Sequence, residues 1–502
     1  MQYLLGIDIG TSSCKVAAFD VNGQLVDEQS ADYPTMYPQS GWAEQDPHDW
    51  WNAVCKAVRN ILSGQKIHPQ DIAGVGLDGQ SWSAVAVDTD GHVLANSPIW
   101  LDTRAEEICA GLRQRIGDQA LFALSGNRLQ PQYTTGKILW YQSERQDVYQ
   151  RADKILQSNS YIAYKLTGAM TQDISQGYGL HCFNIRTKSW DFEMCRALGI
   201  RPSLLPELTA CDTVIGVVQK EAARQTGLLE GTPVIAGGLD AACAALGTGV
   251  IRDGQTQEQG GQAGGMSIMV ERCIADPTLI LSTHVIPNGW LLQGGTTGGS
   301  GVMRWVEAEL AGEERERAVR SGDSVYDLLA QEAAQVPAGC NGVTMLPYMA
   351  GERSPIWNPN AKGVIYGLDF SKTRAHMIRA AMESVAYSLR HNLHVAEKAG
   401  ARVVELRAMG GSSNSEVWMQ IKSDVTGKPI RIASVPSASA LGAAMLAGVG
   451  IGVYRDYDEA VTKAVTLKEG YHPAGETAAA YQRGYEQYLL LYRDLEQLMD
   501  RK

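Results

Sequence analysis

An acidic residue inside an apolar stretch near the start of the chain is the first candidate for chemistry. Residues 4–20 read LLGIDIGTSSCKVAAFD, so Asp8 interrupts a predicted buried strand just before a glycine and hydroxyl loop. Burial of an unpaired carboxylate is costly unless a charge or a ligand compensates it. Beside a bound anion, Asp8 would hold a hydrated Mg²⁺, because Mg²⁺ prefers oxygen ligands and keeps several waters.

The loop that follows Asp8 has the composition of an anion site. A glycine allows close approach of the backbone, and successive amides and hydroxyls can surround a phosphate while a lysine adds positive charge. A turn closed by hydroxyl side chains with a surface lysine explains the same sequence, so the residues alone leave both interpretations open. The candidate phosphate ligands are Gly10, Thr11, Ser12, Ser13 and Lys15.

A second acid, Asp240, directly follows the apolar segment VIAGGL. A carboxylate at a strand end with two glycines before it is open to a ligand and could accept a proton from a hydroxyl nucleophile. The alternative is that Asp240 caps the small-residue helix AACAALG, since aspartate is favoured at that position.

Three glycine-rich segments in the second half of the chain are candidates for nucleotide contacts. GGQAGG and GGTTGGSG each lie between apolar runs, which suits either close backbone approach to a ligand or a plain turn. AMGGSSNSEVW follows a predicted strand and opens a helix, where free amides attract anions. The three segments are residues 260–265, 294–301 and 408–418.

Polar residues beside tryptophan form a fifth group of candidates. GQSWSA and IWLDTRAEE combine side chains that suit a sugar, which presents hydroxyls at its edge and C–H bonds on its face. A core tryptophan and a surface Asp–Arg pair account for the same residues. The candidates are Gln80, Ser81, Trp82, Asp102 and Arg104.

The pattern along the chain predicts two α/β domains. Asn22-Gly23 between two apolar runs predicts a hairpin, and Asp46, Pro47 and Gly64 are the start and stop signals of a helix. A second strand, glycine-rich loop and strand begin near residue 251, so we expect domains at 1–250 and 251–502 with a cleft between them.

Composition limits the classes of function. The 502 residues carry a net charge of -11, which argues against general nucleic-acid binding because phosphate contacts need clustered Lys and Arg. Nine cysteines occur without any C-x-x-C pair, as expected for reduced thiols in a cytoplasmic protein. We expect no signal peptide, because Asp8 interrupts the first apolar run. We expect no membrane span, because the longest small-apolar stretch, residues 440–454, is short and rich in glycine.

Taken in order, these segments resemble the FGGY family of carbohydrate kinases, and within it the xylulokinase-type branch. The resemblance covers nearly the whole chain and includes GIDIGTSSCK, PIWLDTRA, TPVIAGGLDAACAALGTGV, LPYMAGERSPIWNPNAKGVIYGL and AMGGSSNSEVWMQIKSDVTG. It implies two ribonuclease-H-like domains of the actin, hexokinase and Hsp70 ATPase type, which close on Mg-ATP and a sugar. The implied reaction is phosphorylation of a primary hydroxyl of a small ketose or polyol, with D-xylulose as the first candidate.

The resemblance also assigns roles to individual positions. Asp240 falls on the catalytic base, and Asp8 falls on the acid that is important for activity and positions Mg²⁺ through water. Residues 10–13 fall on the loop that contacts the ATP phosphates, and residues 80–82 on the strand that contacts the sugar. The implied nucleotide contacts in the second domain are Gly261, Gln262, Gly264, Gly298, Gly410, Gly411 and Asn414.

Three positions depart from the xylulokinase pattern. Ser81-Trp82 replaces Met-His, Ala241 replaces the Asn after the base, and the loop at 261–264 lacks the usual Thr and Ser. The alternatives are therefore a kinase for another ketose or polyol, a weakened member that regulates by binding sugar or nucleotide, and an actin- or chaperone-like ATPase. The predicted partners are a sugar and ATP, without nucleic acid or membrane, and a homodimer stays open.

Overall fold

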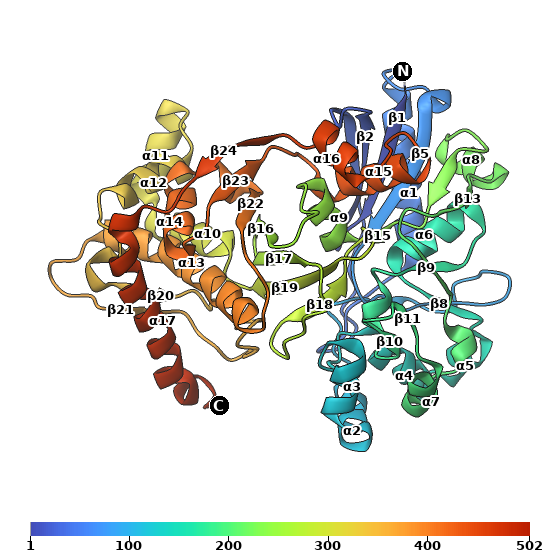
Figure 1. Cartoon of the computed structure of the whole chain (residues 1–502), viewed down its shortest axis with the longest axis horizontal. Coiled ribbons are helices and arrows are strands. Elements are labelled where there is room, and N and C mark those ends of the chain that lie inside the picture. The colour runs from blue at the N-terminus through green and yellow to red at the C-terminus, as the bar shows by residue number, and fades with distance from the viewer. Residues whose placement is uncertain (1, 502) are drawn as a thin grey trace.

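The computed structural model describes residues 2–501, which form two lobes, each built on a seven-stranded mixed sheet (Figure 1). The first sheet has the order β13-β14-β5-β1-β2-β3, and β15 pairs with β5 off this path. Its strands are β1 (Tyr3–Ile9), β2 (Ser13–Asp20), β3 (Leu25–Asp32), β5 (Ile72–Gly79), β13 (Val214–Val217), β14 (Pro233–Ile235) and β15 (Gly238–Leu239).

The second sheet has the order β18-β19-β17-β16-β22-β23-β24. Like the first, it is built on an antiparallel hairpin whose first strand also pairs in parallel with a later strand. The hairpin predicted near residue 251 is therefore confirmed. The strands are β16 (Gln255–Gly260), β17 (Gly264–Val270), β18 (Ile280–Thr283), β19 (Trp290–Thr296), β22 (Glu405–Met409), β23 (Ile430–Ala433) and β24 (Leu467–Tyr471).

Helix α1 (Pro47–Ser63) covers one face of the first sheet, and its ends follow the sequence signals. The Asp46 side chain accepts a hydrogen bond from the His48 backbone, Pro47 is the first helical residue, and Gly64 follows the last. Trp50, Val54 and Ile61 pack with alternate residues of β1 and β2. The remaining helices before residue 250 are α2 (Glu106–Ile116), α3 (Asp118–Ser125), α4 (Thr134–Glu144), α5 (Gln146–Arg151), α6 (Ser158–Thr167), α7 (Phe192–Leu198), α8 (Lys220–Thr226) and α9 (Asp240–Gly247).

Most later helices surround the second sheet, but α15 and α16 lie with the first lobe (Figure 1). The helices are α10 (Ser300–Leu310), α11 (Gly312–Ser321), α12 (Val325–Ala334), α13 (Arg374–Lys398), α14 (Glu416–Thr426), α15 (Ala438–Gly450), α16 (Tyr457–Ala464) and α17 (Ala478–Met499). Short two- and three-residue strands complete the fold: β4 (Glu44–Gln45), β6 (Val85–Val87), β7 (Ser97–Pro98), β8 (Lys154–Leu156), β9 (Thr171–Asp173), β10 (Phe183–Asn184), β11 (Ser189–Trp190), β12 (Glu207–Thr209), β20 (Thr344–Leu346) and β21 (Val364–Tyr366).

Helix α15 covers the other face of the first sheet, packed against α9, β1 and β5. A Cβ on Gly6 would lie 1.9 Å from the Ala440 carbonyl oxygen, and one on Gly76 the same distance from the Ala443 oxygen. Only glycine permits this approach, so the glycines of two strands set how closely the helix lies on the sheet. Among the described residues, no helix combines the length and apolar character that a bilayer crossing requires.

Candidate active site

Three carboxylates meet where strands of the first sheet end. Asp8 on β1 stands directly opposite Asp78 on the parallel strand β5, and Gly238 on β15 pairs with Asp78 from the other side. Asp240 begins α9 two residues after Gly238. Asp78 is fully buried, and neither of its carboxylate oxygens has a hydrogen-bond donor among the described residues.

The crowding of these acids shifts their protonation. Burial, together with the charge on Asp8, raises the pKa of Asp240 to about 7, although the Ala241 amide lowers it in part. Burial raises the pKa of Asp8, which Asp78 and Lys15 lower in part. Burial and the charges on Asp8 and Asp240 raise the pKa of Asp78 well above its ordinary value. A pKa near neutrality suits a group that must accept a proton as a general base.

A buried hydrogen-bond chain holds the backbone at Asp240. The Leu239 amide donates to Ser175 Oγ (2.8 Å), and Ser175 Oγ donates to Asp173 Oδ1 (2.5 Å). Leu239 occupies the cap position of α9 and Asp240 is its first helical residue, so the alternative in which Asp240 caps this helix is wrong. The Asp240 carboxylate accepts one hydrogen bond from the Ala241 amide (2.6 Å).

The glycine and hydroxyl loop lies beside these acids as the β1–β2 turn. The Gly10 amide donates to the Ser13 carbonyl (3.1 Å), and the Trp100 indole donates to Thr11 Oγ1 (2.9 Å). Lys15 on β2 is the cross-strand neighbour of Asp8 on β1. Ser12 is exposed, so its hydroxyl is free to meet a ligand from solvent.

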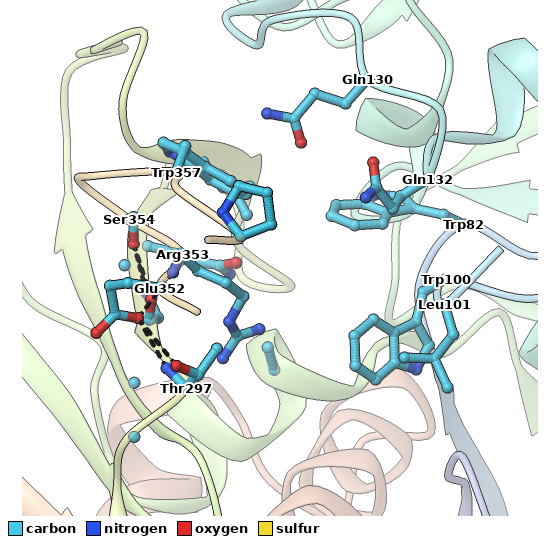
Figure 2. Close-up of a pocket in the computed structure, with 18 of the residues that line it drawn as sticks. Trp82, Trp100, Leu101, Gln130, Gln132, Thr297, Glu352, Arg353, Ser354 and Trp357 are labelled. Carbon is cyan, nitrogen blue, oxygen red and sulfur yellow. Dashed lines mark hydrogen bonds between the residues drawn. The ribbon is translucent and has the colours of Figure 1, made fainter. Parts of the chain in front are cut away.

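A cavity of about 770 Å³ separates the two lobes next to this turn. Figure 2 shows Trp82, Trp100, Leu101, Gln130 and Gln132 on one wall, facing a second wall of residues 352–354 and Trp357. The Trp82 ring lies 4.3 Å from that of Tyr133, between their centroids. Trp82 and Trp357 both have a left-handed backbone, with φ of 61° and 54°. Bulky residues rarely adopt this strained conformation, which concentrates at ligand-binding sites.

Lys137 fixes the wall that the first lobe contributes. Its buried ammonium donates to the carbonyls of Trp82 (2.6 Å), Ile99 (2.7 Å) and Gln132 (2.7 Å). These carbonyls belong to three separate segments, each of which carries residues of the cavity wall. Burial lowers the pKa of Lys137 to about 7. One charged group therefore sets the relative positions of three loops.

The expected sugar residues fall into two groups. Trp82 lines the cavity, Ser81 Oγ accepts from Tyr178 Oη (3.0 Å), and Gln80 is buried, with its amide donating to Gln45 (2.9 Å). Asp102 and Arg104 are not among the residues that line the interlobe cavity, and neither are Asp8, Asp240 or residues 10–13. Asp102 accepts from the Ala43 amide (2.7 Å) and pairs with Arg104 (2.7 Å). The Arg104 guanidinium lies over Trp42, 3.8 Å from the ring centroid, so this pair serves to anchor its own loop.

In the second lobe the expected nucleotide segments converge at one sheet edge. The Gly261 and Gln262 carbonyls accept from the Ser300 and Gly301 amides (2.8 and 2.9 Å). The glycine loop at 298–301 is therefore hydrogen-bonded to the hairpin turn at 261–264. β16 and β22 end side by side, which brings Gly410 against Gly260. Gly411 and Asn414 are exposed beside them.

The donor set at the carboxylates fits a magnesium ion. Asp8 and Asp78 offer only oxygen ligands, and the two carboxyl groups face each other with a hydrogen bond that forms only when one of them is protonated. A cation bound between them would replace that proton. Hard cations with retained waters suit such a set.

Sequence reasoning missed Asp78, Trp100, Tyr133 and Lys137. For Asp78 a signal exists, because GLDG at 76–79 repeats the Gly-x-Asp pattern of GIDIG at 6–10. Nothing local identifies Lys137, whose role depends on three loops that meet only in the folded chain.

Comparison with known proteins agrees with this geometry. Residues 3–247 match the N-terminal domain and residues 266–451 the C-terminal domain of the FGGY family of carbohydrate kinases. Xylulose kinase of Bacillus subtilis (strain 168) is 28% identical over 500 residues, covering 99% of this chain and 98% of that protein. Gluconokinase of the same organism is 30% identical over 498 residues, covering 99% and 96%. The crystal structure of xylulose kinase from Rhodospirillum rubrum superposes with a TM-score of 0.91 at 29% identity, covering 100% of both chains.

Proposed function

Because the chain belongs to the FGGY family of carbohydrate kinases and is an ATP-dependent sugar phosphotransferase, we propose that it phosphorylates a primary hydroxyl of an open-chain ketose or polyol. D-xylulose, giving D-xylulose 5-phosphate, is the first candidate acceptor. The observation that carries the proposal is Asp240, an acid whose pKa burial and the charge on Asp8 raise to about 7 and whose neighbour Ala241 lines the interlobe cavity.

In the proposed mechanism, Asp240 accepts the proton of the acceptor hydroxyl as its oxygen attacks the γ-phosphorus of ATP. The bond from that phosphorus to the bridging oxygen breaks, and ADP leaves with the electron pair. Amides of residues 11–13 and the hydroxyls of Thr11, Ser12 and Ser13 donate to the transferred group, and Lys15 adds charge. Magnesium held near Asp8, through water, would supply charge compensation for the phosphates.

The cavity walls come from different lobes, so closure of the lobes on a sugar would exclude water from the γ-phosphate. The loop at 261–264 lacks the hydroxyls of the family pattern, and its nucleotide contacts then come from backbone amides. A cytoplasmic location and a homodimer remain predictions of the same proposal.

A coupled ADP-release assay across pentuloses, hexuloses, polyols and sugar acids tests the proposal. We expect turnover that depends on the acceptor and on Mg²⁺, with slow ATP hydrolysis when no sugar is present. Fast sugar-independent hydrolysis would contradict the mechanism.

A second candidate acceptor is gluconate, favoured by the match to gluconokinase over 99% of the chain. The remaining alternative is a sugar- or nucleotide-binding regulator. Tight sugar binding by calorimetry without turnover of any acceptor would favour it over the kinase, although retention of both Asp8 and Asp240 argues for catalysis.

A further inference from the structure

Arg353 is a guanidinium without an ionic partner on the wall of the interlobe cavity. Figure 2 shows it extending from the loop at 352–357 into the gap, toward Trp100 and Leu101 of the first lobe. Its Nε is buried without a hydrogen-bond partner, and its one hydrogen bond, from Nη2 to the Thr296 carbonyl, is long at 3.5 Å. Among the described side chains, no acid lies within 4 Å of its nitrogen atoms as an ion pair.

The neighbouring acid is already engaged. Glu352 accepts hydrogen bonds from Thr296 Oγ1 (2.5 Å), the Thr297 amide (2.8 Å) and the Arg353 amide (2.7 Å). These bonds bind Glu352 to the end of β19. Its charge still acts on the neighbouring guanidinium, but no ion pair within 4 Å joins the two described side chains. The cavity's other arginine, Arg113, is also engaged, with the Leu129 carbonyl (2.8 Å) and Glu106 (3.4 Å).

Neighbouring residues fix the position of the Arg353 side chain. The guanidinium lies on Gly295, where a Cβ would be 2.8 Å from Nη2, so glycine at this position gives the arginine its path into the cavity. Ser354 Oγ accepts from the Gly295 amide (2.6 Å) and donates to Asn392 Oδ1 (2.8 Å), which fixes the loop to β19 and α13. Trp357, four residues further on, has the strained backbone described above.

A partly buried guanidinium without a partner is costly, and a planar oxyanion repays that cost with two parallel hydrogen bonds. We propose that Arg353 binds an oxyanion of the reactants in the interlobe cavity. The anion is either a carboxylate of the acceptor, which would make the acceptor a sugar acid, or the phosphoryl group that ATP transfers. This inference rests on the proposed kinase function, because it places both reactants in the same cavity.

Steady-state kinetics of the full-length protein distinguish the two sources. The acceptors are matched pairs of a neutral polyol or ketose and the corresponding aldonate, such as D-xylulose with D-xylonate and D-glucitol with D-gluconate. If the carboxylate is the source, Arg353→Met lowers kcat/KM for the aldonates by about 100-fold and leaves neutral acceptors within about threefold. If the phosphoryl group is the source, kcat falls by about 100-fold with every acceptor while the acceptor KM is unchanged.

Two variants control for folding and for charge. Arg353→Lys keeps the charge without the fork and should recover only part of the loss, while thermal melting shows that each variant is folded. Arg113→Met removes the cavity's other guanidinium and should change kcat/KM by the same factor for neutral and acidic acceptors. Kinetics of Arg353→Met within about twofold of the wild type for all acceptors and for ATP would overturn the proposal.

The outcome for Arg353 can be separated from that for the kinase function. If the wild-type protein phosphorylates no acceptor, the proposed function fails, and calorimetric titration with D-gluconate and with inorganic phosphate tests Arg353 directly. Binding of either anion that Arg353→Met weakens about tenfold or more supports the oxyanion site. Equal binding by both proteins, or no binding of either anion to the wild type, refutes it.

Discussion

The two lobes use the same strand arrangement but treat a buried acid in opposite ways. In the first lobe Asp8 on β1 faces another acid, Asp78, on the parallel strand β5. In the second lobe Glu258 on β16 faces Ala408 on the parallel strand β22. Lys422 of α14 reaches Glu258 at 2.6 Å, and both side chains are almost fully buried.

The difference separates a neutralised acid from a group of acids that repel one another. A buried carboxylate with a lysine partner is a structural solution, whereas three acids with raised pKa values are tolerated only where a ligand or a reaction uses them. The comparison therefore favours the first lobe for the chemical step.

Removal of the base should have the largest effect on activity and leave the fold in place. Asp240→Asn keeps the shape of the side chain but cannot accept the hydroxyl proton, so kcat should fall by about 10²- to 10⁴-fold. The measurement is ADP release at saturating acceptor and ATP, with ATP affinity followed separately by calorimetry. Wild-type turnover in this variant would show that Asp240 is not the base and that the first lobe does not carry the chemical step.

In the second lobe, loss of the lysine should reduce stability. Lys422→Met leaves Glu258 buried without a counter-charge, and we expect the free energy of unfolding to fall by about 3–5 kcal/mol. Urea unfolding measures this change, and the double variant Glu258→Gln/Lys422→Met should recover most of it because no charge is left unpaired. A change below about 0.5 kcal/mol in the free energy of unfolding would show that Lys422 does not neutralise Glu258 as the comparison requires.

The smallest effect is expected at Asp78, and it concerns how the free energy of unfolding depends on pH. Because the pKa of Asp78 is raised in the folded protein, the folded state binds more protons than the unfolded state above the ordinary pKa of aspartate. The free energy of unfolding of the wild type should therefore fall as pH rises above the ordinary pKa of aspartate, and Asp78→Asn should flatten that fall by about 1 kcal/mol or more.

Urea unfolding in magnesium-free buffer at several pH values measures this effect. Asp323→Asn, at an exposed loop position, is the matched control and should keep the wild-type pH dependence. Parallel curves for wild type and Asp78→Asn would mean that Asp78 is not part of the repelling group.

Features of the fold that depend on adjacent residues could be predicted from the sequence. The caps of α1 and the two opening hairpins follow from short-range signals, and each occurs where it was expected. Asp240 was recognisable because its strand end and glycines are contiguous in the chain. The position of α15 was not foreseen, since its small apolar residues carry no signal for which lobe they cover.

Within the site, the misses are residues whose role depends on long-range pairing. Asp78 lies in the site because β5 pairs in parallel with β1, and the Gly-x-Asp pattern that it shares with Asp8 does not by itself show that these two strands are neighbours. Asp102 and Arg104 are predicted sugar ligands that lie outside the lining of the interlobe cavity, and Trp42, more than sixty positions before Arg104 in the chain, provides the ring on which the arginine lies. Lys137 gathers three loops that are far apart in sequence.

The packing of α15 on β1 and β5 has a consequence for any attempt to divide the polypeptide. A fragment ending near residue 250 would lack the helix that covers one face of its sheet, so an apolar surface around Gly6 and Gly76 would meet solvent and favour aggregation. Residues 251–502, supplied as a separate polypeptide in the same cell, would again cover that surface with α15. Reassembly of the two halves would then measure how strongly α15 binds the sheet of the first lobe.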